Sequence, residues 1–443
     1  MSDKLASLYS DHLAILKARH DKALAATGYD HFVAFAGNPH TIFLDDMDYP
    51  FKSNPHLKYW VPVVDNPFCF VVYSPGRKPK LVYNRPVDYW HKVAGDPAGY
   101  WVEHFDIVSI AEPEQAKAHM PAGGRSAFVG ESDPMFAGWG FAAANPPELL
   151  NQLHYDRARK TPYEAECMRE ATVKGVRAHI AAEKAFRAGA SEYEIHLQYL
   201  RASGHMEHEL PYGNIIAMNR NAAVLHYMDT ERVSAPAAER YSFLIDAGAQ
   251  VNGYACDITR TWSQRDDEFA SLIRAMDAMQ LRLVAMVKPG ADYKDIHLET
   301  HLQTAKILAD FGFASGSPES IVEKRISSAF FPHGVGHLLG LQVHDVGGFM
   351  ADPSGTTIPK PEGHPYLRLT RTIETDMVFT IEPGLYFIDS LLDEVRKGPY
   401  ANDVAWEKVA AFRKFGGIRI EDDVMVTATG VENFTRDEWA RQG

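Results

Sequence analysis

The feature that most constrains the fold of this chain is a weak internal duplication in its second half. The segment GASEYEIH, from Gly189, matches GADYKDIH, from Gly290, and each follows a long helical pattern. Further along each half, FLIDAG matches FTIEPG, and both segments are typical of strands. Two matches in the same order predict a domain of two related halves, each a helix pair plus a β-hairpin, around a pseudo-two-fold axis. The matched acids Asp246 and Glu382 are expected to face each other across that axis.

The first half of the chain predicts a separate domain. Up to about residue 155, the short β-rich runs HFVAFAG, FCFVVYSPG, PKLVYN and SAFVGES alternate with helical stretches, which indicates a mixed α/β fold. A helix start follows, with Thr161 as N-cap, Pro162 at the first helical position and Glu164 completing a capping box. At 443 residues the chain is too long for one core. We therefore expect an α/β (α+β) protein with an N-terminal domain over residues 1–158 and a catalytic domain over residues 159–443.

Charge and composition exclude several classes of partner. The net charge is −13 and the chain has no Lys/Arg tract, so neither a nucleic-acid partner nor a membrane surface is expected. The N-terminal segment is typical of an amphipathic helix rather than a signal peptide, and no apolar run approaches membrane-spanning length. The cysteines Cys69, Cys167 and Cys256 are few and widely scattered, which favours a reducing, cytoplasmic location. A small molecule is the expected partner.

The segment RYSFLIDAGAQVNGYACDITRTW predicts a hairpin that carries two acids. A turn centred on residues 251–252 places Asp246 directly opposite Asp257, whereas a turn at 252–253 makes them diagonal on the same face. Two carboxylates so close repel each other and lose hydration, so something must neutralise them. Metal cations are one explanation; water, backbone amides and Arg260 are the alternative.

Three further segments add ligand-type residues to the same domain. FFPHGVGHLLGLQVHDVGG carries His333, His337 and His344 among glycines and apolar residues. Glu382 lies in VFTIEPGLYF, and Glu421 lies in FGGIRIEDDV, where strand alternation separates it from the neighbouring isoleucines. Each of these strands therefore presents an acid among apolar residues.

Four strand acids and one glycine-flanked histidine predict a metal centre. An oxygen-rich ligand set favours Mn²⁺ or a similar ion over thiolate-bound zinc. Five ligands are too many for one tetrahedral ion but suit two ions bridged by carboxylates. A water shared by the two ions would be acidified to a nucleophile, so the expected reaction is hydrolysis. The predicted metal ligands are Asp246, Asp257, His337, Glu382 and Glu421.

The motifs LIDAGAQVNGYACDIT, PHGVGHLLGLQVHD, TIEPGLYF and GIRIEDDV resemble the successive motifs of the pita-bread metallopeptidases. That group includes methionine aminopeptidase, aminopeptidase P and prolidase. Chain length and phrases such as LDDMDYPFK, RPVDYWH, VLHYM and GLQVHDVGGFM resemble the bacterial Xaa-Pro dipeptidase (prolidase) family over nearly the whole chain. The resemblance implies a C-terminal pita-bread domain, a homodimer and hydrolysis of dipeptides that end in proline.

The same resemblance implies roles for the predicted ligands. Asp246 would bind one ion, and His337 with Glu382 the other. Asp257 and Glu421 would bridge the two ions, which would hold a bridging hydroxide as nucleophile. Glu382 would also relay the proton from this nucleophile to the leaving imino nitrogen.

The remaining expected site residues are carried over from the family in the same way. His226 and His344 would steady the substrate carbonyl and the tetrahedral intermediate, and Arg368 would hold the terminal carboxylate of the dipeptide. Asp45 would reach in from a neighbouring subunit. The other residues would line the pocket for the first residue or cover the proline ring: Tyr212, Leu225, Val343, His333, Arg419, Tyr293 and Leu367.

Three alternatives remain open at the level of the sequence. Prolidases similar to the organophosphorus acid anhydrolases also cleave organophosphorus triesters, so such a side activity is expected. Aminopeptidase P differs mainly in accepting longer Xaa-Pro peptides. Some pita-bread proteins are non-catalytic binding proteins, although those have typically lost the acidic ligands. Residues 389–414 interrupt the second predicted hairpin, and the sequence assigns them no role.

Overall fold

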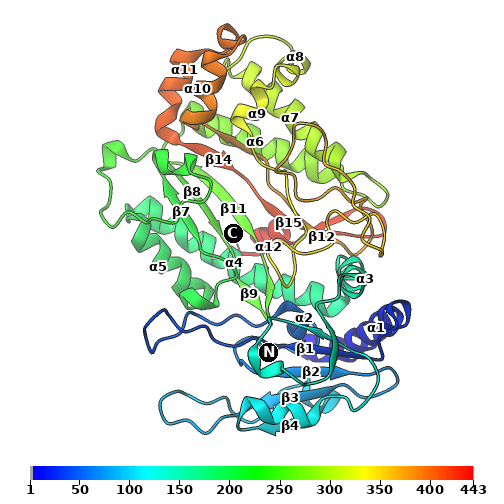
Figure 1. Cartoon of the computed structure of the whole chain (residues 1–443). Coiled ribbons are helices and arrows are strands. Elements are labelled where there is room, and N and C mark those ends of the chain that lie inside the picture. Colours follow the sequence, from blue (N-terminus) through cyan, green and yellow to red (C-terminus); the bar gives the residue numbers. More distant parts are fainter. Residues whose placement is uncertain (1–2, 443) are drawn as a thin grey trace. The chain divides into compact units, whose positions relative to one another are not determined.

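The computed structural model describes residues 3–442 and divides into two compact units (Figure 1). Unit 1 contains the chain up to Cys167 together with residues 251–254 and 352–356, and unit 2 contains the remainder. The expected domain boundary at residue 158 falls between two helices, α3 (Pro147–Arg157) and α4 (Pro162–Ala188). None of the helices within residues 3–442 combines the length and apolar character needed to span a bilayer.

Unit 1 is built around a six-stranded sheet with the strand order β4-β3-β2-β1-β5-β6. The four β-rich runs of the sequence form β1, β2, β3 and β5, as predicted. β1 pairs antiparallel with β2 and parallel with β5, so the sheet is mixed. The strands are β1 (His31–Phe35), β2 (Phe70–Tyr73), β3 (Lys80–Asn84), β4 (Asp106–Ile110), β5 (Ser126–Val129) and β6 (Phe141–Ala144).

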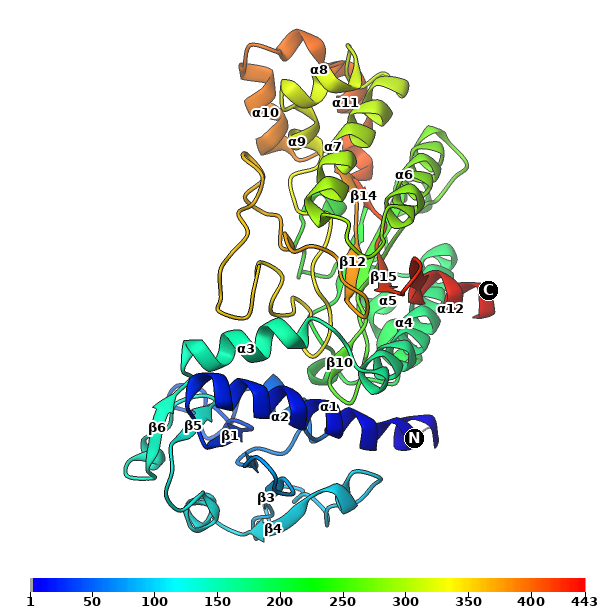
Figure 2. The same cartoon turned by 90° about the vertical axis from the view of Figure 1, so that its right-hand side faces the viewer.

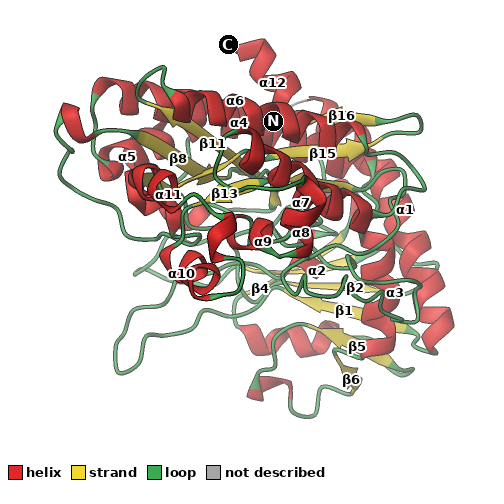
Figure 3. Cartoon of the chain, turned by 90° about the horizontal axis from the view of Figure 1, so that it is seen from above, coloured by secondary structure: helices red, strands yellow, loops and turns green. Residues whose placement is uncertain are grey.

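The four central strands of this sheet are buried on both faces, whereas the edge strands β4 and β6 are partly exposed. The N-terminal helix α1 (Asp3–Thr27) packs beside α3, as Figure 3 shows. The ring of Phe32 on β1 lies 4.7 Å from that of His20 on α1, whereas Val33 belongs to a second core on the opposite face. Alternation along β1 therefore divides the core of unit 1 in two. A short helix, α2 (Pro55–Lys58), completes the regular helices of this unit.

Unit 2 contains two halves of matching architecture, which confirms the predicted duplication and the α/β fold class. The first half has the helix pair α4 and α5 (Glu192–Ser203), followed by a sheet of order β11-β8-β7. The second half has α6 (Glu268–Ala285) and α7 (Tyr293–Asp310), followed by a sheet of order β12-β15-β16. The strands are β7 (Ile215–Met218), β8 (Ser242–Ala247), β11 (Ile258–Ser263), β12 (Val378–Ile381), β15 (Asp422–Val426) and β16 (Val431–Asn433).

The start of α4 is fixed by the capping box that the sequence predicts. The Thr161 amide donates to Oε2 of Glu164 at 2.8 Å, and the Glu164 amide donates to the Thr161 hydroxyl at 3.3 Å. Two otherwise unpaired donors are thus satisfied at the helix end. Both residues are buried, so the box also fills part of the core.

Strand alternation on β8 places one acid away from the helices. Phe243 and Ile245 pack with residues of α4 and α5, which lie along one face of this sheet (Figure 2). Leu244 belongs to a small core on the opposite face, with Ile215 of β7. Asp246 shares the orientation of Leu244 because side chains alternate along a strand. The helix-covered face is therefore structural, and the other face is free for a site.

The first hairpin resolves the two registers left open by the sequence. The turn lies at Asn252 and Gly253, whose φ angles are 55° and 87°, between β9 (Gln250–Val251) and β10 (Tyr254–Ala255). Positive φ at both turn residues suits Asn-Gly in a two-residue hairpin turn. Asp246 on β8 pairs with Thr259 on β11, so Asp257 stands one diagonal away on the same face.

The segment at 389–414 folds as a helical insertion in the second hairpin. It contains α10 (Asp389–Lys397) and α11 (Trp406–Phe412) and lies between β13 (Gly384–Tyr386) and β14 (Gly417–Arg419), with α10 packed on α9 (Ile326–Phe330) (Figure 1). β13 and β14 still pair, so the insertion leaves the hairpin intact. The remaining helices of unit 2 are α8 (Pro318–Glu323) and α12 (Phe434–Gln442).

Candidate metal centre

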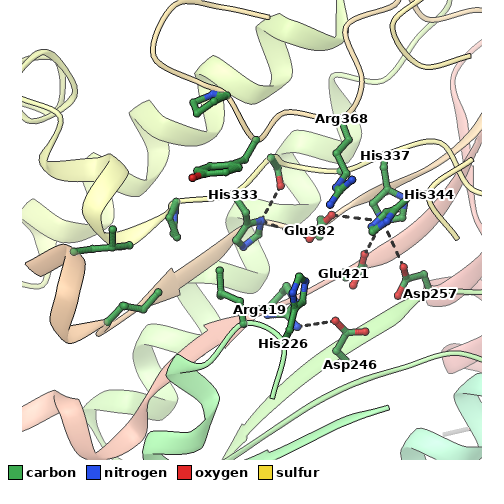
Figure 4. Close-up of a pocket in the computed structure, with 18 of the residues that line it drawn as sticks. His226, Asp246, Asp257, His333, His337, His344, Arg368, Glu382, Arg419 and Glu421 are labelled. Carbon is green, nitrogen blue, oxygen red and sulfur yellow. Dashed lines mark hydrogen bonds and ion pairs between the residues drawn. The ribbon is translucent and has the colours of Figure 1, made fainter. Parts of the chain in front are cut away.

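All five predicted metal ligands line one cavity of unit 2, with a volume of about 800 Å³ (Figure 4). The ligands come from the ends of four strands and one loop, so the sheet of each half contributes to the same site. The pairs Ile381–Asp422 and Gly384–Arg419 place Glu382 opposite Glu421 across the second hairpin. The two hairpins therefore contribute two acids each.

The tightest group in the cavity consists of Asp257, His337 and Glu421. One potential ligand atom from each residue lies within 4.8 Å of the others, and all three side chains are buried. Nε2 of His337 is 3.4 Å from Oδ2 of Asp257 and 4.0 Å from Oε1 of Glu421. Nδ1 of His337 hydrogen-bonds the Leu338 carbonyl at 3.0 Å, which directs Nε2 toward the acids.

Glu382 lies between two histidines at the edge of this group. Its Oε1 is 3.7 Å from Nε2 of His337, and its Oε2 is 3.6 Å from Nδ1 of His333 (Figure 4). Burial raises the pKa of Glu382 to about 7, although the charges of His337 and Arg419 act in the opposite direction. A carboxyl group with a pKa near neutrality can both accept and release a proton under physiological conditions.

Asp246 is held by two neighbours. Tyr212 donates to its Oδ1 at 2.8 Å, and Nη2 of Arg419 donates to its Oδ2 at 2.7 Å. The Tyr212 hydroxyl also lies 2.5 Å from Oδ1 of Asp257. Burial raises the pKa of Asp246, with only partial compensation by Arg419. The two acids of the first hairpin are thus joined by one tyrosine.

The electrostatics of the cavity favour cations. Burial and the charges of Asp257 and Glu382 raise the pKa of Glu421 well above its usual value. For Asp257, hydrogen bonds from His337 and Tyr212 outweigh burial and lower its pKa. Four carboxyl groups, of which Asp257 and Glu421 are buried and Asp246 and Glu382 are partly buried, thus share Arg419 and His337 as their positive partners. Divalent cations would neutralise this excess of negative charge, so the residues fit a metal centre.

The sequence left open that Arg260 neutralises Asp246 and Asp257, but the structure gives this arginine other partners. Its guanidinium donates to Oδ1 of Asp422 at 2.6 Å and to the Glu421 carbonyl at 2.8 Å. Asp422 lies on the opposite face of its strand from Glu421, where Arg436 also binds it at 2.7 Å. Arg260 therefore belongs to a buried ion-pair network behind the site and does not neutralise Asp246 or Asp257.

Three residues that the sequence analysis missed orient the ligands. The Thr259 hydroxyl donates to Oε2 of Glu421 at 2.7 Å, and the Thr380 hydroxyl accepts from the His337 amide at 3.2 Å. Asp423 accepts from the Asp257 amide at 3.0 Å. The sequence could have indicated Thr259, because it lies two residues after Asp257 and its side chain therefore points to the same face of the strand.

Six of the expected substrate-contacting residues line the cavity: Leu225, His226, His333, His344, Arg368 and Arg419. Arg368 is exposed and, within residues 3–442, forms no hydrogen bond or ion pair; Figure 4 shows it directed into the cavity toward Glu382. Partial burial and the nearby charges of His337 and Arg368 lower the pKa of His344 to about 4. At neutral pH this imidazole is therefore uncharged.

The other expected contacts do not line this cavity, although Tyr212 contacts two of the predicted ligands. Tyr293 is fully buried and donates to the Thr380 carbonyl at 2.9 Å, and Leu367 lines a smaller neighbouring cavity. Val343 and Tyr212 are outside the lining of the large cavity. Asp45 is an exposed residue of unit 1.

The inserted segment contributes cavity residues that the sequence did not suggest. Ser390 and Leu391, in the first turn of α10, line the large cavity together with Tyr366 and with Ile388, which directly precedes the inserted segment. No pattern within 389–414 marks these positions, because their place in the wall depends on how α10 packs.

Comparisons with known proteins agree with this architecture. Residues 7–155 match the model of the Xaa-Pro dipeptidase N-terminal domain, and residues 166–428 match metallopeptidase family M24. The chain is 51% identical to an Xaa-Pro dipeptidase of Stenotrophomonas maltophilia (strain K279a) over 436 residues, 98% of each chain. It is 50% identical to the Xaa-Pro dipeptidase of Aeromonas hydrophila subsp. hydrophila over 430 residues, 97% of this chain and 98% of the relative.

Solved structures share the fold at lower identity. The structure of Pseudomonas aeruginosa aminopeptidase PepP aligns with a TM-score of 0.72 and 23% identity over 98% of both chains. A histidine-to-alanine variant of Escherichia coli aminopeptidase P aligns with a TM-score of 0.71 and 21% identity over 95% of both chains. The fold of this chain is therefore a known one.

Proposed function

The chain belongs to the Xaa-Pro dipeptidases of metallopeptidase family M24, and on that premise we propose that it hydrolyses Xaa-Pro dipeptides with two divalent metal ions. The observation that carries this proposal is the group of four carboxylates and His337 in one cavity, with the unpaired Arg368 directed at it. The relatives named Xaa-Pro dipeptidase share about half of their residues with this chain over nearly its full length, which supports the same substrate class.

The ligand set supports two hard ions, for which Mn²⁺ is our proposal. Asp246 would bind one ion and His337 with Glu382 the other, while Asp257 and Glu421 would bridge them. Four carboxylates carry a charge that two divalent cations balance, and an oxygen-rich set with one imidazole suits Mn²⁺ better than a soft ion. Thr259 would keep the Glu421 carboxylate oriented, and Thr380 would hold the backbone of His337 through its amide.

When bound, the two ions would lower the pKa of a shared water and polarise the scissile carbonyl. Glu382 would accept a proton from the attacking water and deliver it to the leaving imino nitrogen, as a general acid–base group. His333 lies 3.6 Å from Glu382 and would border this carboxylate, while its Nδ1 hydrogen-bonds the Gly334 carbonyl at 2.8 Å.

Histidines would stabilise the charge that develops on the substrate. His344 is uncharged at neutral pH because its pKa is about 4, so it would donate a hydrogen bond without repelling the metal ions. His226 lines the same cavity and would donate from the other side. Both would act on the carbonyl oxygen as it becomes tetrahedral.

Specificity would come from the two ends of the dipeptide. Arg368 would bind the terminal carboxylate, and Arg419 with Leu225 would line the walls nearer the metal centre. Leu367 and Tyr293 would support the wall at the proline ring, and Val343 and Tyr212 the wall at the first residue. We further propose a homodimer in which Asp45 completes the site of the neighbouring subunit. Three buried cysteines, which form no disulfide within residues 3–442, suit a reducing, cytoplasmic location.

The decisive experiment tests metal and substrate together. The protein is stripped with chelator, reloaded with Mn²⁺, and assayed on an Xaa-Pro dipeptide, an Xaa-Pro tripeptide and an Xaa-Ala dipeptide. We expect activity on the first only, and only after reloading. Cleavage of the tripeptide would indicate an aminopeptidase P activity, and an absence of turnover on all three would indicate a binding protein.

Organophosphorus triesters are a second candidate substrate. Two bridged ions can activate water against a phosphoryl centre as well as a carbonyl. The cavity of about 800 Å³ has room for a branched ester. Such an ester lacks a carboxylate, so its hydrolysis would not depend on Arg368.

A further inference from the structure

A second cluster of potential ligands lies in unit 2, apart from the carboxylate centre. It consists of His297 and His301 on α7 and His364 in the loop before β12. One ring nitrogen of each lies within 4.8 Å of the other two. His297 and His301 are four residues apart on one helix, so they occupy the same helix face. Nothing in the proposed peptidase reaction uses these three residues.

Burial makes this cluster unusual for histidines. His297 is 1% exposed and His301 is 2% exposed. Nε2 of His297 lies 2.9 Å from Nδ1 of His364, whereas Nδ1 of His297 is buried with no hydrogen-bond partner within residues 3–442. Burying imidazole nitrogens without full hydrogen bonding is unfavourable, so three histidines gathered here lower stability in a way that apolar side chains would not.

The three rings face one another edge to face. Their centroids are 4.9 Å apart for His297 and His301, 4.8 Å for His297 and His364, and 4.6 Å for His301 and His364. Nδ1 of His301 is 3.3 Å from the Ser327 hydroxyl, which leaves Nε2 to face the other rings. A hydrogen bond to the remote nitrogen is the usual support for a metal-binding imidazole.

The imidazoles are also in the protonation state that a metal requires. Burial and the neighbouring rings lower the pKa of His297 to about 3 and that of His301 to about 2, and burial lowers the pKa of His364. Neutral imidazoles offer lone pairs, so an ion would not have to displace protons near neutral pH.

We propose that His297, His301 and His364 form an additional metal site that binds one ion of the Zn²⁺ class. Three imidazoles without a carboxylate favour Zn²⁺, Co²⁺, Ni²⁺ or Cu²⁺ over Mn²⁺, which prefers oxygen ligands. A tetrahedral Zn²⁺ with Zn–N distances of about 2.0–2.1 Å needs nitrogens roughly 3.4 Å apart. Nε2 of His297 and Nδ1 of His364 are 2.9 Å apart, and ring rotation would have to adjust the spacing to His301.

The fourth ligand position would open into a cavity of about 210 Å³ that the three histidines line together with Arg325. Arg325 donates to the Gly363 carbonyl and places a positive charge near the site, which opposes cation binding. An anionic fourth ligand, such as hydroxide or chloride, would offset that charge. The cavity shares Pro332, His333 and Tyr366 with the large cavity, so the ion would lie beside the substrate pocket.

The experiment compares metal stoichiometries. Stripped protein is dialysed against Zn²⁺ or Mn²⁺ alone, and bound metal per chain is measured by elemental analysis. We expect the wild type to bind one more Zn²⁺ than Mn²⁺. His301→Ala and His364→Ala should each lose that one Zn²⁺ and keep their Mn²⁺, and His208→Ala, a change at an exposed histidine, should lose neither. Co²⁺-loaded wild type should show a tetrahedral Co²⁺ absorption that both variants lack.

Equal Zn²⁺ binding in the wild type and both variants would overturn the proposal. Retained Mn²⁺ binding reports that a variant is folded, and His364→Ala, in a loop, decides the question if His301→Ala does not fold. The same titration in Asp257→Asn separates this site from the carboxylate centre. The additional Zn²⁺ should persist there; its loss would place the ion among the carboxylates instead.

Discussion

Asp246 and Asp257 share a single hydroxyl group: that of Tyr212 lies 2.8 Å from Oδ1 of the first and 2.5 Å from Oδ1 of the second. A hydroxyl carries one hydrogen and can donate it to only one carboxylate at a time. The second contact therefore brings two lone pairs together unless a carboxyl proton or a cation intervenes. A proton on Asp246, whose pKa is raised by burial, or the cations proposed for this centre would each satisfy both contacts.

The first prediction concerns Asp257, which lies in the tightest part of the centre. Asp257→Asn should lower the metal content of the protein and abolish dipeptide turnover, because a bridging carboxylate contributes to both ions. Elemental analysis and a dipeptide assay measure the two effects. Asp266→Asn, at a side chain that is 87% exposed, is the matched control and should change neither. Full metal content and normal turnover in Asp257→Asn would contradict the assignment.

The second prediction isolates the proton relay. Glu382→Gln preserves the shape and one ligand oxygen but cannot accept a proton, so kcat should fall by roughly 10²–10⁴-fold. Metal content must be measured alongside kcat, because a loss of ions would produce the same decrease. A variant that holds its metal and turns over within a few-fold of the wild type would show that another group moves the proton.

The third prediction concerns the stability of the stripped protein. The pKa of Glu382 is raised to about 7, so its folded form binds more protons than the unfolded chain between the two pKa values. The contribution of Glu382 to the free energy of unfolding is therefore fully present below the unfolded pKa of about 4.3. It is lost as the pH rises through the pKa of the folded state. Glu382→Gln should therefore stabilise the stripped protein, on the order of 3 kcal/mol at about pH 8 and much less at about pH 5.

The comparison between variant and wild type is needed because other groups titrate in the opposite direction. Burial lowers the pKa of His12 and His179 to about 3, so these histidines reduce stability as the pH falls. Their contribution is the same in both proteins and cancels in the difference. Urea unfolding at several pH values measures the difference in the free energy of unfolding between the variant and the wild type. If this difference does not change with pH, Glu382 is not the titrating group.

The sequence predicted those parts of the site that local patterns determine. Alternation of apolar and polar residues predicted an acid on each of four strands; Asp246 lies within β8, whereas Asp257, Glu382 and Glu421 lie in short breaks next to strands. The capping box of Thr161 and Glu164 correctly predicted where α4 begins. The hairpin register stayed open between two turns, because Val251–Asn252 and Asn252–Gly253 differ by a single residue. The φ angles of 55° and 87° at Asn252 and Gly253 identify the second turn.

Other features depend on tertiary packing and leave no local signal. Thr259 and Glu421 are 162 residues apart in the chain, and only the joining of the two halves brings their side chains to 2.7 Å. The same holds for Leu391, which reaches the cavity because α10 packs on α9. In the three-histidine cluster, the spacing of His297 and His301 on one helix is visible in the sequence. The sequence does not indicate that His364, in a distant loop, lies beside them.

The last prediction separates a dipeptidase from its nearest enzymatic alternatives, and it depends on Arg368. A dipeptidase must recognise a carboxylate one residue beyond the scissile bond, and a guanidinium offers that group a planar, permanently charged pair of donors. A longer peptide has an amide at this position, which would leave Arg368 without its partner and crowd the additional residue against it. Arg368 is directed into the cavity and is not bound by another side chain within residues 3–442, so it is available for this role.

Arg368→Ala should therefore lower kcat/KM for Xaa-Pro dipeptides by roughly 10- to 150-fold, the value of a hydrogen bond to a charged group. Arg368→Lys keeps the charge but loses the paired donors, and it should recover only part of that loss. Hydrolysis of an organophosphorus triester should be nearly unchanged in both variants, because this substrate has no carboxylate. Both activities are measured with metal content checked in each protein. Equal losses on the two substrates would indicate general damage to the site, and unchanged dipeptide hydrolysis would show that another group holds the carboxylate.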